Sequence, residues 1–98
     1  MGTARVTWDP AKAATNVRKH GVPFGEAESV FYDEFALFDD DPDESYGEQR
    51  FILVGMSGAL RVLVVCHCVR QEGAVIRIIS ARKAVKAERD EYWTRIKR

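Results

Sequence analysis

Side chains suited to phosphate binding and proton transfer gather between residues 74 and 92. The first half of this stretch alternates branched apolar residues like a buried strand, yet it also contains Arg77 and Arg82. The second half predicts a helix, and three-and-four spacing places a carboxylate, Glu88, on its inward side. The inward-facing positions of this helix are Val85, Glu88, Tyr92 and Ile96. Because an unpaired buried charge is costly, we expect Glu88 to pair with Arg77 or Arg82.

The elements that must position this cluster are predicted to follow the order βααββββα, which is an α+β fold in a single domain of residues 1–98. A short strand at 5–8 precedes a helix with Asp9 at its N-cap, Pro10 at its first position and Gly21 at its end. The apolar stripe of this helix is Ala13, Ala14 and Val17, and that of a second, shorter helix is Phe24, Ala27, Val30 and Phe31.

Four further strands are predicted at 35–38, 50–56, 61–69 and 74–82, with an acidic loop at 39–44. Turns at 57–58 and 71–73 join the last three strands as neighbours, so we expect an antiparallel meander with the first strand added at an edge. Residues 62–66 are apolar on both faces, so their strand should be central and covered by helices on at least one side. The C-terminal helix should pack back against the sheet.

The formal net charge of zero hides an uneven distribution of charge along the chain. Residues 1–24 carry a net charge of +3, residues 25–48 hold ten acidic and no basic side chains, and residues 49–98 carry +7. This segregation is expected if one face binds phosphate while another is acidic. A surface of mutual salt bridges would explain the same pattern.

Two groups of potential metal ligands are predicted not to bind metal. Cys66 and Cys68 share one face of their strand while His67 points to the other, so we expect small buried thiols and a core histidine. The acidic loop lacks the calcium-loop pattern, because Glu44 and Arg50 stand where glycine and glutamate are required. We therefore predict no metal site and no cofactor.

The chain is predicted to be cytoplasmic. No apolar run approaches the roughly 20 residues of a membrane-spanning helix. Residues 1–5 also lack the apolar core of a signal peptide.

Two stretches resemble the BrnT family of bacterial and archaeal toxins. The first reads Trp8-Asp9-Pro10-x-Lys12-x-x-x-Asn16-x-x-Lys19-His20-Gly21-Val22-x-Phe24. The second reads Arg77-Ile78-Ile79-Ser80-Ala81-Arg82-Lys83-Ala84, followed by Glu88-Arg89 and Tyr92. Together with Arg50 and Gly55 between them, the match extends over nearly the whole chain, whereas residues 39–48 and 66–68 match no pattern of the family.

This resemblance implies a RelE-like fold. It also implies an endoribonuclease toxin of a type II toxin-antitoxin pair, which cleaves RNA without a metal ion and inhibits translation and growth. The implied partners are an RNA substrate and a BrnA-type antitoxin that neutralises the toxin. Operator DNA would be bound only through the complex with that antitoxin.

RNA supplies its own nucleophile, the 2′-hydroxyl beside the phosphate, so the protein must align it, move protons and stabilise the added negative charge. Guanidinium groups suit that charge, which makes Arg50, Arg77 and Arg82 the catalytic candidates. Proton transfer falls to Glu88, Tyr92 or His20, and spacing does not choose among them. We expect RNA binding by Lys12, Lys19, His20 and Lys83.

Structural roles remain open for the same side chains. Glu88 could form a purely structural ion pair, Tyr92 could belong to the core, and His20 could interact with the negative end of its helix. Two other functions compete with RNA cleavage. One is a nucleic-acid-binding or protein-interaction module without chemistry, and the other is a metal-dependent nuclease that uses the carboxylates of residues 39–44.

Overall fold

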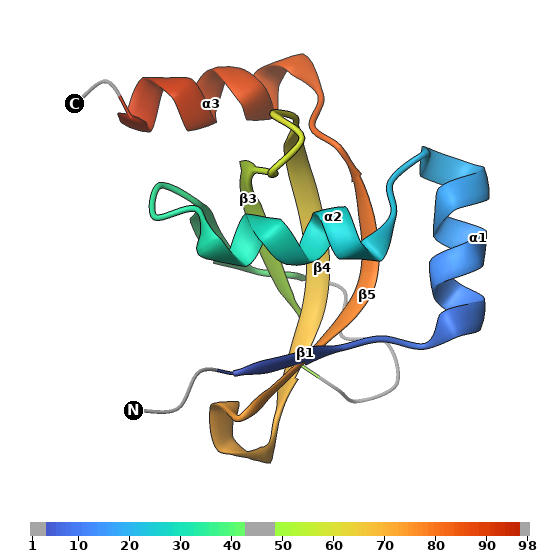
Figure 1. Cartoon of the computed structure of the whole chain (residues 1–98). Helices are drawn as coiled ribbons and strands as arrows, with labels where there is room; N and C mark the ends of the chain where they lie inside the picture. Colours follow the sequence, from blue (N-terminus) through green and yellow to red (C-terminus); the bar gives the residue numbers. More distant parts are fainter. Residues whose placement is uncertain (1–3, 43–48, 97–98) are drawn as a thin grey trace.

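The computed structural model describes residues 4–42 and 49–96, and within them five strands form one sheet in the order β1-β5-β4-β3-β2 (Figure 1). The strands are β1 (Arg5–Thr7), β2 (Leu37–Asp40), β3 (Phe51–Met56), β4 (Val62–Arg70) and β5 (Val75–Lys83). The helices are α1 (Pro10–His20), α2 (Phe24–Ser29), α3 (Lys86–Ile96) and two short 3-10 helices, η1 (Val30–Tyr32) and η3 (Gln71–Gly73). The predicted α+β class is confirmed.

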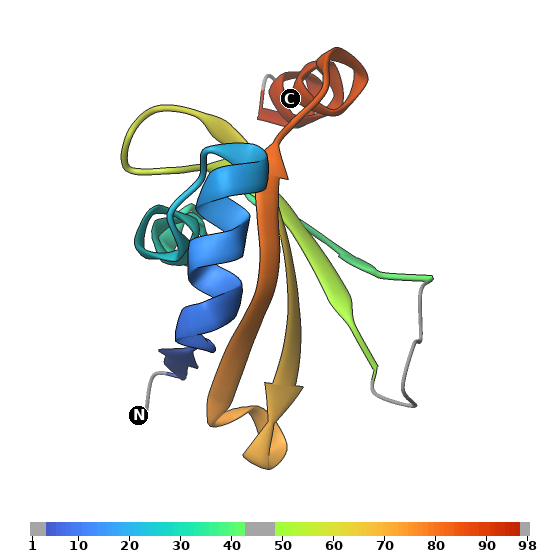
Figure 2. The ribbon, with the colours of Figure 1, turned by 90° about the vertical axis from the view of Figure 1, so that its right-hand side faces the viewer.

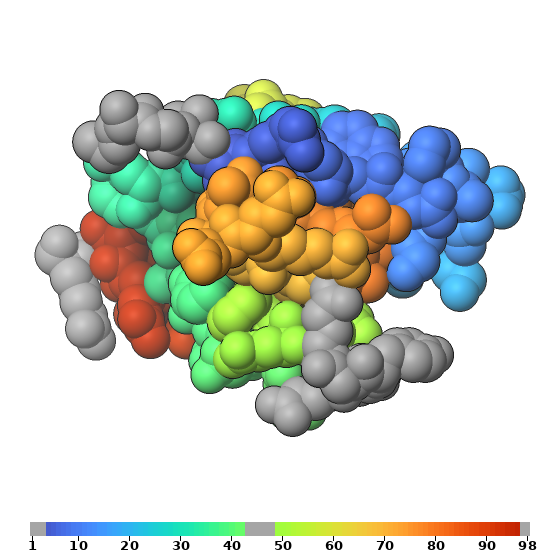
Figure 3. Space-filling model, turned by 90° about the horizontal axis from the view of Figure 1, so that it is seen from below, coloured from blue at the N-terminus to red at the C-terminus, as the bar shows by residue number. Residues whose placement is uncertain are grey.

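The sheet is mixed, so the expected antiparallel arrangement holds for four of its five strands. Strands β2 to β5 do form the predicted antiparallel meander. Strand β1 lies at one edge, as predicted, but it runs parallel to β5, with Arg5 opposite Val75. β1 and β5 are not joined by a hairpin, because most of the chain lies between them. A long connection of this kind permits parallel pairing. Seen from the end that carries the β4–β5 connection (orange), β1 (dark blue) and β3 (light green) lie on either side of it (Figure 3).

The two faces of the sheet have different covers. Helices α1 and α2 lie on one side, and α3 crosses one end (Figure 2). We call the side of α1 and α2 the helical face and the other side the open face. The helical face carries the core cluster Val22, Phe24, Ala27, Val30, Leu53, Leu63, Val65, Ile78 and Ala81. The open face carries a smaller cluster under α3, made of Val62, Val64, Ala84 and Tyr92.

Strand β4 is the central strand, as its apolar sequence predicted. Residues 62–68 are all buried, and the side chains of residues 62–65 alternate between the two clusters. The alternation also places His67 on the helical face and Cys66 and Cys68 on the open face, and all three are buried. None of the helices within the described part of the chain is long and apolar enough to span a membrane.

Helix α1 begins and ends as predicted, but its buried side differs from the expected one. Asp9 accepts a hydrogen bond from the Ala11 amide, Pro10 opens the helix, and Gly21 ends it with a positive φ of 68°. Val17, expected in the core, is 44% exposed, whereas the polar Asn16 is 5% exposed. The cause is that α1 packs at the edge of β5, where unpaired backbone groups need a polar partner.

The acidic segment after residue 38 is partly strand rather than loop. Asp39 and Asp40 pair with Ile52 and Phe51, and the Asp41 amide donates to the carbonyl of Arg50 at 2.9 Å. An edge strand accommodates such charges because its outer side faces solvent. Asp43 and Glu44 of the predicted loop lie outside the described residues.

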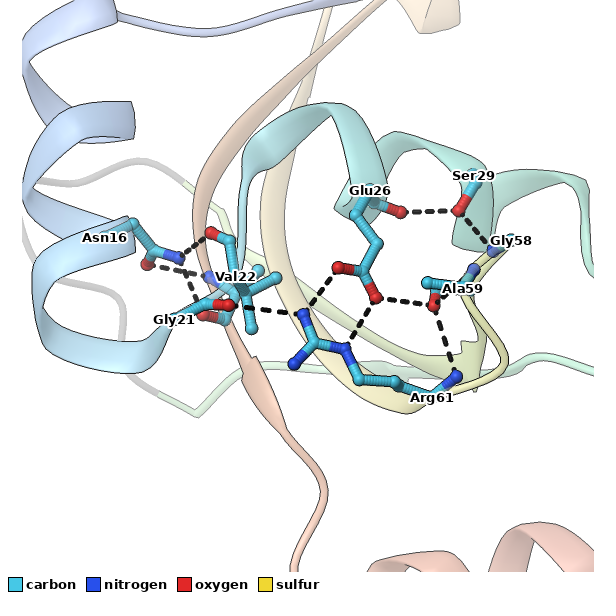
Figure 4. A network of polar contacts seen from close by, with 10 residues as sticks. Asn16, Gly21, Val22, Glu26, Ser29, Gly58, Ala59 and Arg61 are labelled. Carbon is cyan, nitrogen blue, oxygen red and sulfur yellow. Dashed lines mark hydrogen bonds and ion pairs between the residues drawn. The ribbon is translucent and has the colours of Figure 1, made fainter.

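A polar network fastens α2 to the turn between β3 and β4 (Figure 4). The Glu26 carboxylate accepts hydrogen bonds from Arg61 Nε at 2.9 Å and from Ser57 Oγ at 2.7 Å. The Gly58 amide donates to Ser29 Oγ at 2.8 Å. The Arg61 guanidinium lowers the pKa of Glu26, as expected for a paired carboxylate. The turn is therefore held in one position relative to the helical layer.

Candidate active site

A β-bulge places Arg77 and Arg82 on the same face of the sheet. They are five positions apart in the chain, so strict alternation would send their side chains to opposite faces. The register of β4 with β5 shifts between Cys66 and His67, so Cys66 lies opposite Ser80 and Cys68 lies opposite Arg77. Both cysteines belong to the open face, and residues directly opposite in a ladder share a face. Arg77, Ser80 and Arg82 therefore all belong to the open face.

A pocket of about 220 Å³ on the open face brings together two of the three candidate arginines. It is lined by His20, Asp41, Arg50, Ile52, Val64, Cys66, Ser80, Ala81 and Arg82, and we call it the arginine pocket. Arg50 reaches it from the start of β3, Arg82 from the end of β5, and His20 from the last turn of α1. Arg77 is partly buried on the same face and does not line this pocket.

Arg82 is oriented by Glu88, as the sequence predicted for this carboxylate. Nη1 and Nη2 of Arg82 donate to Oε1 and Oε2 of Glu88 at 2.8 and 2.9 Å, which is a two-pronged ion pair. Glu88 Oε1 also accepts the Val85 amide at 2.8 Å, at the start of α3. The hydrogen bonds from Arg82 lower the pKa of Glu88. A carboxylate held ionised in this way is a good orienting group and a weak base.

Arg50 is fixed by contacts at the other wall of the pocket. Its Nε lies 3.6 Å from Oδ2 of Asp41, and its Nη2 lies 3.0 Å from Sγ of Cys66. The Cys66 thiol in turn donates to Asp41 Oδ2 at 3.2 Å. Burial raises the pKa of the Cys66 thiol, which keeps it protonated and unsuited to act as a nucleophile. Cys66 is therefore a wall of the pocket that helps to hold Arg50.

A second pocket continues the arginine pocket along α1. It has a volume of about 290 Å³ and is lined by Ala11, Lys12, Thr15, Asn16, Lys19, His20, Ile79 and Ser80, and we call it the helix pocket. His20 and Ser80 line both pockets, so the two adjoin. Lys12 and Lys19, predicted to bind RNA, thus lie beside the predicted catalytic arginines. Together the two pockets form one basic groove.

Asn16 positions α1 against β5 and so joins the two walls of this groove. Its Nδ2 donates to the carbonyls of Ala81 at 2.8 Å and of Val22 at 2.9 Å, and its Oδ1 accepts the Ala81 amide at 3.1 Å. The side chain therefore pairs with β5 much as a neighbouring strand would, beyond the point where β1 ends. Neither Asn16 nor Ser80 was predicted as a site residue, although both stand in the family-like motifs.

The structure does not bring Tyr92 or Lys83 into the groove. Tyr92 is 2% exposed, and its hydroxyl donates to Asp33 Oδ2 in the interface between α3 and the sheet. Burial and then the Asp33 carboxylate raise the pKa of Tyr92 to about 12. Lys83 lies opposite Leu63, on the helical face, and lines a different pocket. Val85, expected on the inward side of α3, is 58% exposed because α3 begins after it.

Replacing Tyr92 with phenylalanine tests its position directly. We expect RNA cleavage to stay within about twofold of the starting protein, because the hydroxyl is remote from the groove. We also expect unfolding free energy to fall by about 1–3 kcal/mol, because the half-buried Asp33 carboxylate loses the hydrogen bond from the buried Tyr92. Urea unfolding and initial cleavage rates measure the two effects. A strongly reduced rate with little change in stability would restore Tyr92 as a catalytic residue.

The Cys66-His67-Cys68 triplet does not converge on a common point. His67 is 2% exposed and packs edge-on against Phe31, with ring centroids 4.9 Å apart. Burial lowers the pKa of His67, so it is a neutral core residue. Within residues 4–42 and 49–96, no three His, Cys, Asp or Glu side chains are grouped so that they could hold a metal ion.

Comparison with known proteins points to one family. A family model described as the ribonuclease toxin BrnT of type II toxin-antitoxin systems matches residues 8–88. The crystal structure of the Brucella abortus ribonuclease toxin BrnT is similar, with a TM-score of 0.62 and 23% sequence identity over 86% of this chain and 100% of that one. At this identity the likeness supports the fold. The comparison with curated proteins found no match.

Proposed function

The chain belongs to the BrnT family of ribonuclease toxins of type II toxin-antitoxin systems, and from this premise we propose that it cleaves RNA in the basic groove without a metal ion. One observation carries the assignment to this groove. Arg50, just before β3, and Arg82, near the end of β5, line the same pocket as His20 and Ser80. Lys12 and Lys19 extend the positive charge along α1. The groove thus offers contacts for one phosphate and for the backbone that continues from it.

In the proposed reaction the 2′-oxygen loses its proton to a base and attacks the adjacent phosphorus. The bond from phosphorus to the 5′-oxygen then breaks, and that oxygen takes up a proton. The products are a 2′,3′-cyclic phosphate and a 5′-hydroxyl. Arg50 and Arg82 stabilise the negative charge that builds up on the phosphorane oxygens. The Glu88 pair uses two N–H groups of Arg82 and the Lys83 carbonyl accepts a third at 3.4 Å, so that Nε and the second N–H of Nη2 are available to the phosphate.

His20 is the proposed residue for proton transfer. It lines both pockets, so its imidazole lies where the scissile phosphate would be bound. An imidazole both accepts and donates protons readily near neutral pH. Glu88 is the weaker candidate because Arg82 engages both of its oxygens, and it serves instead as a positioning residue. Arg77, on the same face, is proposed to contact a flanking phosphate.

As a toxin, the protein is proposed to inhibit translation and growth by cutting RNA. A BrnA-type antitoxin is proposed to neutralise it, and operator DNA would be bound only through their complex. The four-stranded meander with a helical pair on one face and α3 on the other also supports a RelE-like fold.

Metal independence and the 2′-hydroxyl mechanism can be tested together. The purified protein is incubated with an RNA oligonucleotide in excess EDTA, and with the same oligonucleotide carrying 2′-deoxy at the scissile position. We expect full cleavage in EDTA and none at the deoxy position. Loss of cleavage in EDTA that Mg²⁺ restores would favour the metal-dependent alternative. RNA binding that weakens steeply with salt, without any cleavage, would favour the non-catalytic one.

A further inference from the structure

A separate pocket lies between the β3–β4 turn and α3. It has a volume of about 310 Å³, and we call it the turn pocket. It is lined by Met56, Leu60, Arg61, Val62, Lys83, Ala84, Arg89 and Trp93. It shares no lining residue with the arginine pocket or the helix pocket. Its walls combine apolar side chains with three cations, of which Arg61 is already paired with Glu26, and no acidic residue is among the described residues that line it.

Leu60 is placed in this pocket at a cost to the isolated protein. It is 81% exposed, and its φ is 64°, in the left-handed region that suits glycine, asparagine or aspartate. An exposed leucine in that conformation gains little from burial within its own chain. Trp93, on the opposite wall, is 43% exposed although a tryptophan offers a large apolar surface. Both side chains could be covered by one apolar partner.

The turn that presents Leu60 is rigidly held. The Leu60 amide donates to the Ser57 carbonyl at 2.9 Å, and the Ser57 amide donates to the Arg61 carbonyl at 2.8 Å. The contacts of Glu26 and Ser29 then tie the same turn to α2 (Figure 4). A preorganised surface loses little conformational entropy when a partner binds, which favours a defined docking site.

We propose that the turn pocket is the docking site for an acidic, apolar segment of the antitoxin, an inference that rests on the proposed function. Apolar side chains of that segment would cover Leu60 and Trp93, and its carboxylates would pair with Lys83 and Arg89. RNA is the poorer occupant, because the basic groove already offers its backbone a continuous path on another part of the surface. Type II toxins act together with an antitoxin, which supplies the partner.

The turn pocket and the arginine pocket are lined by neighbouring residues of β5. Arg89 lines the turn pocket, and its neighbour Glu88 orients Arg82 in the arginine pocket. Lys83 and Arg82 are likewise consecutive at the end of β5, and each lines a different pocket. Residues that line the turn pocket are therefore adjacent in the chain to Arg82 and to the Glu88 that orients it.

The test uses Leu60→Asp, with Leu60→Asn as the uncharged version and Tyr32→Asp as the matched control. Tyr32 is also strongly exposed, at 76%, and does not line the turn pocket. The left-handed backbone at residue 60 accepts asparagine and aspartate, so both variants should fold. Affinity for the purified cognate antitoxin is measured by isothermal titration calorimetry. RNA cleavage is measured on the same proteins.

We expect Leu60→Asp to weaken antitoxin binding by roughly 10- to 100-fold, Leu60→Asn to weaken it less, and Tyr32→Asp to leave it unchanged. RNA cleavage should be unchanged in all three. Unaltered antitoxin affinity in Leu60→Asp would overturn the proposal. If Leu60→Asp weakens RNA binding and leaves antitoxin binding unchanged, the pocket binds RNA. If it abolishes self-association and leaves antitoxin binding unchanged, the pocket binds a second copy of this chain. Weakened antitoxin binding in a protein that cleaves no RNA would uphold the docking site and reject the proposed function.

Discussion

Replacement of Arg82 by alanine is expected to slow RNA cleavage by roughly 10²- to 10³-fold, the usual cost of removing one group that stabilises transition-state charge. Arg82 is oriented by a two-pronged pair with Glu88, so its remaining donors are fixed before the substrate binds. Arg50→Ala should have an effect of the same order, because Arg50 lines the same pocket. Single-turnover cleavage of a defined RNA at saturating protein measures both.

The matched control is Arg95→Ala. Arg95 is also an arginine paired with a glutamate on α3, at 3.6 Å from Glu91, but it lines neither pocket of the groove. The Arg95→Ala variant should cleave RNA at the same rate as the starting protein. Arg82→Lys keeps the charge but loses the two-pronged geometry, so its rate should fall between those of the alanine variant and the starting protein. If folded Arg50→Ala and Arg82→Ala both cleave normally, the groove is not the active site.

Replacement of Asn16 by alanine is expected to lower the unfolding free energy by about 3 kcal/mol or more. The change leaves the buried amide and carbonyl of Ala81 and the carbonyl of Val22 without this partner, at about 1–3 kcal/mol for each unsatisfied group. Asn16→Asp should also destabilise the fold, because it would place a carboxylate against two carbonyl oxygens. Urea unfolding followed by circular dichroism gives the values.

The neighbouring Thr15→Ala serves as the control for α1. Thr15 is half-buried, and its hydroxyl accepts only a solvent-exposed hydrogen bond from Arg18 at 3.2 Å, so stability should change by less than about 0.5 kcal/mol. Asn16→Ala should also raise the KM for RNA under conditions where the variant remains folded, because α1 carries Lys12 and Lys19. Equal stability of Asn16→Ala and Thr15→Ala would show that Asn16 does not anchor α1.

Local signals in the sequence predicted much of the framework correctly. Asp9, Pro10 and Gly21 define α1 because capping depends on residues within one or two positions. The apolar run at 62–66 predicted the central strand because burial on both faces requires apolar residues on both. Paired charges close in the chain were also predictable, since Glu88 lies six residues after Arg82.

What the sequence could not supply were features that depend on distant backbone. Asn16 forms hydrogen bonds with the backbone of Ala81 on β5, 65 positions later in the chain. No periodicity in α1 indicates that partner. The parallel pairing of β1 with β5 also joins the first and last strands in the chain. No tight turn connects these strands, so the sequence does not indicate whether they run parallel or antiparallel. The spacing of Tyr92 is compatible with a core residue and with a catalytic residue. Its burial and its hydrogen bond to Asp33 place it in the core.

The sequence by itself determined the α+β class, the family and which side chains carry the charge, because each of these depends on composition and local pattern. Tertiary structure alone decided which of those charges meet. Alternation along β5 would separate Arg77 from Arg82, and a shift in register against β4 returns both to the open face. Which side chains face one another thus depends on how a strand pairs with its neighbour, and that pairing is a property of the assembled sheet.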